Sequence, residues 1–155
     1  MKVLLVEDDE NKRAQIAGHL RNSPRVSSVD WAGSYSSALK YLISKSYDIV
    51  VLDMTLPTFD VSPDDDGGRP QALGGQELLK QMKRRAITTP VVVVTQFDRF
   101  GERRDALTLE QLDRQLSTDH ANIYIGSVYY NATVEGWKDQ LSSFINRVLG
   151  SQESL

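Results

Sequence analysis

Short runs of apolar residues recur along this chain, and each is followed by a segment with helical spacing. Residues 91–94 are four consecutive valines, and residues 3–6 and 49–52 are similarly apolar. Such short continuous runs are typical of strands that are buried on both faces of a sheet. Residues 26–32 and 123–129 contain more polar residues. We expect both to be strands as well, with 26–32 nearer an edge of the sheet.

The segments between these strands carry apolar residues at helical spacing. Ser34 is well placed to be an N-cap, because its hydroxyl can accept a hydrogen bond from the first turn of a helix. Five strands that alternate with five helices predict an α/β fold, with a doubly wound parallel sheet covered by helices on both faces. The expected helices span residues 10–21, 34–45, 76–85, 108–117 and 133–149.

The composition indicates one globular domain. The chain has 155 residues, of which 40% are hydrophobic and 25% are charged. We expect the domain to span residues 1–150, with 151–155 as a C-terminal tail. The net charge of −3 argues against direct DNA binding, and the absence of cysteine excludes disulfides and thiolate metal sites. The first apolar run is too short for a signal peptide or a membrane span, so we expect a cytoplasmic protein without membrane contact.

Polar residues follow three of the predicted strands at the point where each strand ends. Glu7, Asp8 and Asp9 follow the first strand, Asp53 follows the third, and Thr95 ends the fourth. Ligands of open α/β sheets bind beyond the carboxyl ends of the strands. If the strand order is the usual doubly wound one, these side chains converge on one pocket.

A cluster of carboxylates favours a divalent cation, because like charges repel each other and raise each other's pKa values. Oxygen ligands of this kind suit Mg²⁺, which also binds phosphate oxygens. Asp53, bound to the same ion, can attack a phosphoryl donor and form an acyl phosphate. The simpler alternative is that Asp8 or Asp9 only caps the first helix and interacts with its dipole.

With these residues in this order, the chain resembles a bacterial response-regulator receiver domain over nearly its whole length. Each motif alone has low specificity, but their combination is specific. The resemblance implies a flavodoxin-like fold and a signalling domain instead of an enzyme. The matching motifs are VEDD at 6–9, LDMTLP at 52–57, GQELL at 75–79 and VT at 94–95.

The resemblance also implies roles for individual residues. Asp53 matches the phosphorylated aspartate, and Thr95 matches the hydroxyl residue that senses the phosphoryl group. Tyr124 matches a switch aromatic residue, although a tyrosine at this place can equally be an ordinary core residue. The implied Mg²⁺ ligands are all oxygen donors: Glu7, Asp8, Asp53 and the backbone carbonyl of Thr55.

The chain departs from the family pattern at a position that binds the phosphoryl group. The family has a lysine at the end of the fifth strand, and Ser127 occupies that place by its spacing from Tyr124. The sequence has no lysine between Lys83 and Lys138. Three residues of the loop after Thr95 could supply a cation instead: Arg99, Arg103 and Arg104.

Two further departures concern loops and access to the pocket. Residues 58–74 form a long polar loop, and long loops in compact domains are usually functional or disordered. Residues 96–121 hold a second charged loop. Gln96 follows Thr95 where the family usually has a small residue, so we expect Gln96 to crowd the pocket.

The resemblance favours a response regulator that is phosphorylated on Asp53 with Mg²⁺ and signals through protein–protein contacts. Its expected partners are a histidine kinase or phosphotransfer protein and a downstream protein, and the oligomeric state stays open between monomer and homodimer. The alternative is a degenerate pseudo-receiver that acts as a phosphorylation-independent interaction module. An aspartyl phosphohydrolase is less favoured because residue 55 is not acidic. A flavin protein is disfavoured because Glu7, Asp8 and Asp9 would repel its phosphate.

Overall fold

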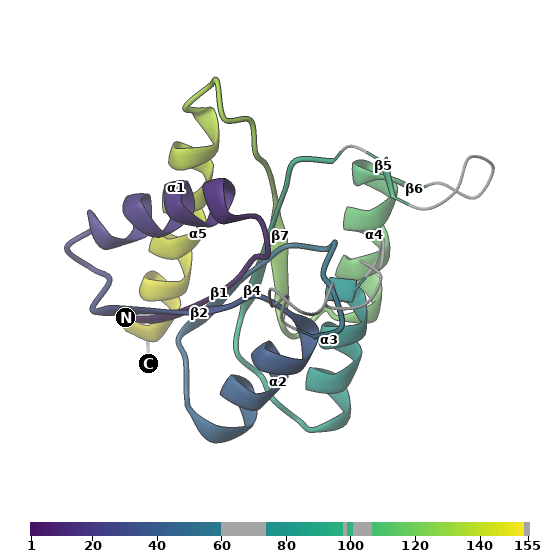
Figure 1. The fold of residues 1–155 in the computed structure, drawn as a ribbon. Coiled ribbons are helices and arrows are strands. Elements are labelled where there is room, and N and C mark those ends of the chain that lie inside the picture. Colours follow the sequence, from purple (N-terminus) through teal and green to yellow (C-terminus); the bar gives the residue numbers. More distant parts are fainter. Residues whose placement is uncertain (60–73, 98, 101–106, 154–155) are drawn as a thin grey trace.

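The computed structural model describes residues 1–59, 74–97, 99–100 and 107–153. Its centre is a parallel sheet with the strand order β2-β1-β3-β4-β7 (Figure 1). The strands of this sheet are β1 (Lys2–Val6), β2 (Ser28–Ala32), β3 (Ile49–Leu52), β4 (Val91–Thr95) and β7 (Tyr124–Tyr129). A short antiparallel pair, β5 (Arg99–Phe100) and β6 (Leu107–Thr108), lies outside it. The predicted doubly wound sheet is confirmed, and β2 is an edge strand as expected.

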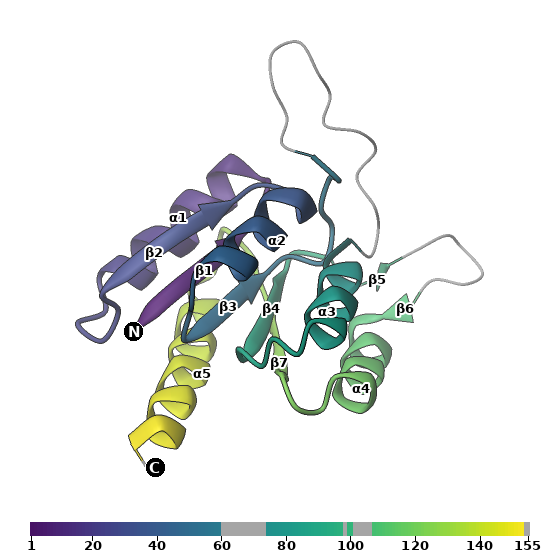
Figure 2. The ribbon, with the colours of Figure 1, turned by 90° about the horizontal axis from the view of Figure 1, so that it is seen from below.

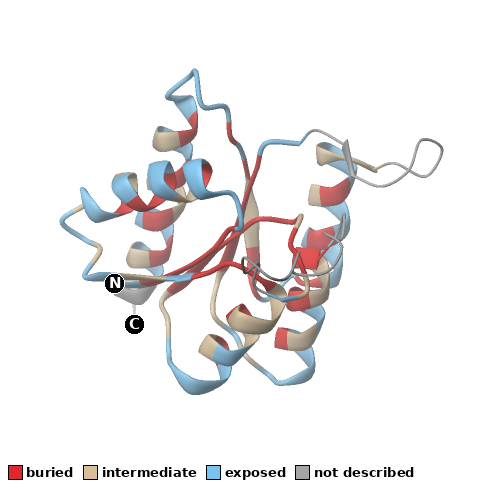
Figure 3. Ribbon diagram, viewed as in Figure 1, coloured by how far each residue is buried: buried red, intermediate tan, exposed pale blue. Residues whose placement is uncertain are grey.

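Helices cover both faces of the sheet. The helices are α1 (Glu10–Arg21), α2 (Tyr35–Ser44), α3 (Gly74–Arg84), α4 (Leu109–Asp119) and α5 (Gly136–Glu153). Helices α1 and α5 pack on one face, and α2, α3 and α4 pack on the other (Figure 2). Successive residues of β1 point to opposite faces, so Leu4 and Leu5 belong to different cores. This arrangement buries β1, β3 and β4 on both faces (Figure 3).

The observed ends of helices α2 and α5 can be compared with the ends that the sequence predicts. Ser34 is the N-cap of α2, because its hydroxyl accepts a hydrogen bond from the Ser37 amide at 3.1 Å. Helix α5 begins at Gly136, later than expected, because the Asn131 side chain accepts hydrogen bonds from the Thr133 amide and hydroxyl and forms a turn. The helix then continues to Glu153, so the expected tail boundary at residue 150 lies inside it.

The topology places the carboxyl ends of β1, β3 and β4 side by side at one edge of the sheet. Strand β3 pairs with β1 on one side and with β4 on the other. Residues that directly follow these strands therefore share one side of the molecule, which is the arrangement that the proposed pocket requires. No helix among the described residues is long and apolar enough to span a membrane.

Candidate functional site

Three carboxylates meet at the carboxyl edge of the sheet. One oxygen each from Glu7, Asp8 and Asp53 lies within 4.8 Å of the other two. Glu7 and Asp53 are buried, with exposed fractions of 1% and 5%, whereas Asp8 is exposed. The structure thus brings together the three acidic residues that the sequence placed in one pocket.

Backbone hydrogen bonds fix the two buried carboxylates to the ends of their strands. The Asp53 amide donates to the Val6 carbonyl at 2.9 Å, and the Glu7 amide donates to the Ala32 carbonyl at 3.0 Å. The Trp31 indole N–H donates to the Glu7 carbonyl at 2.7 Å. Both carboxylates therefore stand on backbone that is hydrogen-bonded directly to the ends of neighbouring strands.

Gly75 allows helix α3 to approach the segment that follows Asp53. Its amide donates to the Met54 carbonyl at 2.8 Å. A Cβ atom at this position would lie 2.7 Å from the Asp53 carbonyl oxygen and 2.9 Å from the Met54 Cα. The close approach requires glycine here, and it links the position of α3 to the position of Asp53.

Asp9 has a separate structural role as the N-cap of α1. Its carboxylate accepts a hydrogen bond from the Lys12 amide at 2.9 Å, and its own amide donates to Glu7 Oε1 at 3.0 Å. Of the two capping candidates, Asp9 caps the helix and Asp8 joins the carboxylate cluster. The acidic motif after β1 therefore serves both purposes.

A lysine from helix α1 reaches into the cluster, and the sequence reasoning missed it. Lys12 has an exposed fraction of only 2%, and its Nζ lies 2.6 Å from Glu7 Oε2 and 3.4 Å from Asp53 Oδ1. The same ammonium donates to the Val94 carbonyl at 2.8 Å. The signal was present in the sequence: Lys12 shares a spacing of four residues with Ile16 and Leu20, which form the buried face of this helix.

Burial governs the protonation of the two inner carboxylates. It raises the pKa of Asp53, a shift that Lys12 opposes and the nearby charge of Asp8 reinforces. Burial also raises the pKa of Glu7, with a further contribution from Asp53 and opposition from Lys12. When all four groups are ionised, three carboxylates and one ammonium carry a net charge of −2. One divalent cation would balance this charge.

The residues of the pocket fit Mg²⁺. The donors are carboxylate oxygens, which this hard cation prefers. Asp53 Oδ1 is buried and has no hydrogen-bond partner among the described residues. This oxygen is therefore available to coordinate a metal ion or to bond to a phosphoryl group. The backbone of Thr55 hydrogen-bonds the Asp53 carboxylate and lowers its pKa, which places Thr55 beside the same pocket.

Thr95 and its neighbour lie where β4 ends. Thr95 is fully buried, and its hydroxyl accepts a hydrogen bond from the Phe97 amide at 3.1 Å. Gln96 is exposed, and its crowding of the pocket stays a prediction. Because β3 pairs with β4, the hydroxyl of Thr95 and the carboxylate of Asp53 belong to adjacent strand ends.

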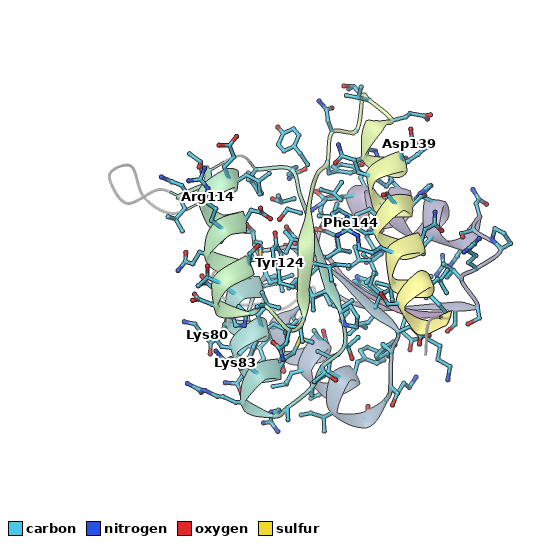
Figure 4. The ribbon with its side chains drawn as sticks, turned by 180° about the vertical axis from the view of Figure 1, so that it is seen from behind. Lys80, Lys83, Arg114, Tyr124, Asp139 and Phe144 are labelled. Carbon is cyan, nitrogen blue, oxygen red and sulfur yellow. The ribbon has the colours of Figure 1, made fainter. Side chains whose placement is uncertain are left out.

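Tyr124 and Ser127 both lie on β7. The hydroxyl of the buried Tyr124, which is labelled in Figure 4, donates to Asp113 Oδ1 at 2.5 Å and hydrogen-bonds the Ser127 hydroxyl. Ser127 pairs with Val93, two residues before the end of β4, whereas the Tyr130 amide donates to the Thr95 carbonyl at 2.7 Å. The structure therefore connects Ser127 to Tyr124 and places Tyr130 beside the end of β4.

The side chains of the three arginines that could replace the missing lysine lie outside the described part of the chain. Arg99 lies in β5 with a side chain outside the described part of the chain, and Arg103 and Arg104 lie wholly outside it. Most of the loop 58–74 is likewise outside the described residues. Lys12 is the cation that ion-pairs with the carboxylate cluster within the described ranges.

Comparisons with known proteins agree with this arrangement. A family model described as "Response regulator receiver domain" matches residues 3–114. The Detocs response regulatory protein DtcB of Enterobacter cloacae is 31% identical over 143 residues, which cover 91% of this chain and 95% of that protein.

Two solved structures share the fold at low sequence identity. The receiver domain of Francisella response regulator 1452 has a TM-score of 0.65 and 18% identity, and the match covers 97% of this chain and 98% of that one. The Thermotoga maritima response regulator TrrA in complex with Mg²⁺–BeF has a TM-score of 0.61 and 18% identity, and the match covers 95% and 97% of the two chains.

Proposed function

Because this chain belongs to the response regulator receiver domain family of two-component signalling, we propose that it is phosphorylated on Asp53 with Mg²⁺ and signals through protein–protein contacts. The observation that carries the proposal is the cluster of Glu7, Asp8 and Asp53. Asp53 combines burial with an oxygen that lacks a hydrogen-bond partner within the described residues. A carboxylate held in this way is suited to be a nucleophile toward phosphorus.

The chemistry needs one bond to form while another breaks. A carboxylate oxygen of Asp53 attacks the phosphorus of the donor and forms a P–O bond. The bond from phosphorus to the leaving group breaks, and the leaving group keeps the electron pair. The product is an acyl phosphate on Asp53.

The other residues of the pocket position the reactants. Bound Mg²⁺ would neutralise phosphoryl oxygens, and Glu7, Asp8, Asp53 and the Thr55 carbonyl would hold it. The Thr95 hydroxyl, which accepts a hydrogen bond from the Phe97 amide, would donate its own O–H to a phosphoryl oxygen. The response regulator TrrA, which shares this fold, was solved in complex with Mg²⁺–BeF.

The donor would be a histidine kinase or phosphotransfer protein, and the response would reach a downstream protein. We assign the response to the face formed by α4, β7 and α5, where Tyr124 at the start of β7 hydrogen-bonds Asp113 of α4 (Figure 4). Phosphorylation biases a two-state element by adding charge in one place. The hydrogen bonds from Tyr124 to Asp113 and Ser127 would be the contacts that such a bias rearranges.

A phosphorylation-independent interaction module is the second candidate. Ser127, at the place of the family lysine by spacing, favours it. Such a protein would bind Mg²⁺ and its partner equally well with or without a phosphodonor. Partner binding that does not change when Asp53 is replaced by asparagine would support this second candidate.

Incubation with acetyl phosphate and Mg²⁺, followed by measurement of the intact mass, tests the proposed function. We expect the mass to increase by one phosphoryl group in the wild type, and not in Asp53→Asn or when Mg²⁺ is omitted. If neither acetyl phosphate nor a purified histidine kinase phosphorylates the protein, the proposal is wrong and the interaction module is the better description.

A further inference from the structure

The pocket already contains a positive charge, and that charge comes from helix α1 instead of the end of β7. We propose that Lys12 supplies the ammonium that binds the phosphoryl group on Asp53, in place of the missing strand-five lysine. This inference rests on the proposed phosphorylation of Asp53. It assigns the phosphoryl-binding role to a residue that the family pattern does not mark.

The position of Lys12 Nζ is the first argument. It contacts residues from three strand ends: Glu7 after β1, Asp53 after β3, and the Val94 carbonyl in β4. It also lies 5.9 Å from the centre of the Tyr130 ring, just after β7. The ammonium therefore lies among the carboxyl ends of β1, β3 and β4, with the Tyr130 ring that follows β7 nearby.

The hydrogen bonds of the ammonium are the second argument. A lysine ammonium has three N–H donors. Glu7 Oε2 at 2.6 Å and the Val94 carbonyl at 2.8 Å accept two of them. Asp53 Oδ1, at 3.4 Å, forms an ion pair but no hydrogen bond. One N–H donor is thus not used by Glu7 or Val94, and the ammonium lies 3.4 Å from the carboxylate that would carry the phosphoryl group.

The burial of Lys12 is the third argument. A lysine with an exposed fraction of 2% loses most of its hydration, so it must be held by opposite charges. Within the described ranges, the other lysine ion pairs, Lys45 with Asp30 and Lys138 with Glu135, lie away from the cluster and are at least partly exposed. Lys12 is therefore built into the pocket and is not a surface lysine in a transient contact.

The proposed role involves binding and no proton transfer. Lys12 keeps its proton while the P–O bond to Asp53 forms and the bond to the leaving group breaks. Its charge offsets the negative charge that the phosphoryl group brings into the pocket. A different role is that Lys12 only fills the place of the metal and leaves when Mg²⁺ binds.

Beryllofluoride, a non-covalent mimic of the phosphoryl group, distinguishes these roles. The binding of Mg²⁺ alone is measured by titration calorimetry, and that of beryllofluoride at saturating Mg²⁺ by fluorine NMR. We expect Lys12→Met to bind Mg²⁺ at least as tightly as the wild type, but to bind beryllofluoride about ten- to a hundred-fold more weakly. The matched control is Lys40→Met, an exposed lysine on α2, which should leave both affinities unchanged.

Each outcome decides between the alternatives. If Lys12→Met binds beryllofluoride as tightly as the wild type does, the inference is wrong. If this variant also binds Mg²⁺ more tightly than the wild type, Lys12 only occupies the place of the metal. A wild type that binds Mg²⁺ but no beryllofluoride overturns the proposed function itself. Mg²⁺ binding also shows that the variant is folded; if Lys12→Met is unfolded, Lys12→Gln is measured by the same criteria.

Discussion

Replacing Gly75 by alanine tests how helix α3 fixes the position of Asp53. The added methyl group would lie 2.7 Å from the Asp53 carbonyl oxygen and 2.9 Å from the Met54 Cα, and neither backbone atom can rotate away. Overpacking of this kind costs about 1–3 kcal/mol. For a chain of this size, the expected decrease in melting temperature is about 2–4 °C for each kcal/mol lost. Displacement of the Asp53 backbone should also slow phosphorylation by acetyl phosphate.

Gly18→Ala is the matched control, because a methyl group there meets nothing within 4 Å on the exposed side of α1. That substitution should stabilise the protein by about 0.5–1 kcal/mol, since alanine loses less conformational freedom in a helix. Urea denaturation of both variants measures the difference. If Gly75→Ala is as stable as Gly18→Ala and is phosphorylated at the wild-type rate, the close packing of α3 against Asp53 does not position this residue.

Three further predictions concern the pocket and β7. Tyr124→Phe removes the hydroxyl that bonds Asp113 and Ser127, and should lower the free energy of unfolding in urea by about 1–2 kcal/mol; unchanged stability would contradict this role. Asp53→Asn removes a negative charge beside Glu7, so the metal-free variant should melt above the wild type but gain little from Mg²⁺; full stabilisation by Mg²⁺ would show that the metal binds elsewhere. Burial raises the pKa values of Glu7 and Asp53, so the folded metal-free protein retains protons that the unfolded chain has lost, and its stability should fall as the pH rises above about 4. Mg²⁺ binds the deprotonated carboxylates and should therefore raise the melting temperature more at neutral pH than at about pH 5; an equal rise at both would refute this linkage.

The fold could be predicted from the sequence because its constraints are local and repeated. A strand buried on both faces must be apolar throughout, and residues 91–94 meet that condition with four valines. Once the strands are parallel, their carboxyl ends share one edge. The meeting of Glu7 and Asp53 then follows from topology, without knowledge of any side-chain conformation.

Features that depend on single side-chain contacts were harder to predict. The late start of α5 depends on the hydrogen bonds of the Asn131 side chain, which compete with the helix. Lys12 was overlooked because a lysine near a helix N-terminus is usually solvated. Its place on the face of Ile16 and Leu20 was the available signal, since a charge on a buried face needs partners.

The acyl phosphate on Asp53 is the central claim, and trapping it tests the claim most directly. Borohydride reduces an acyl phosphate to an alcohol and would convert a phosphorylated aspartate into homoserine. The protein is phosphorylated with Mg²⁺, reduced, digested and sequenced by tandem mass spectrometry. We predict homoserine at position 53, in an amount that rises with the phosphorylated fraction. Homoserine at another aspartate, or a phosphorylated protein with unmodified Asp53, would contradict the account.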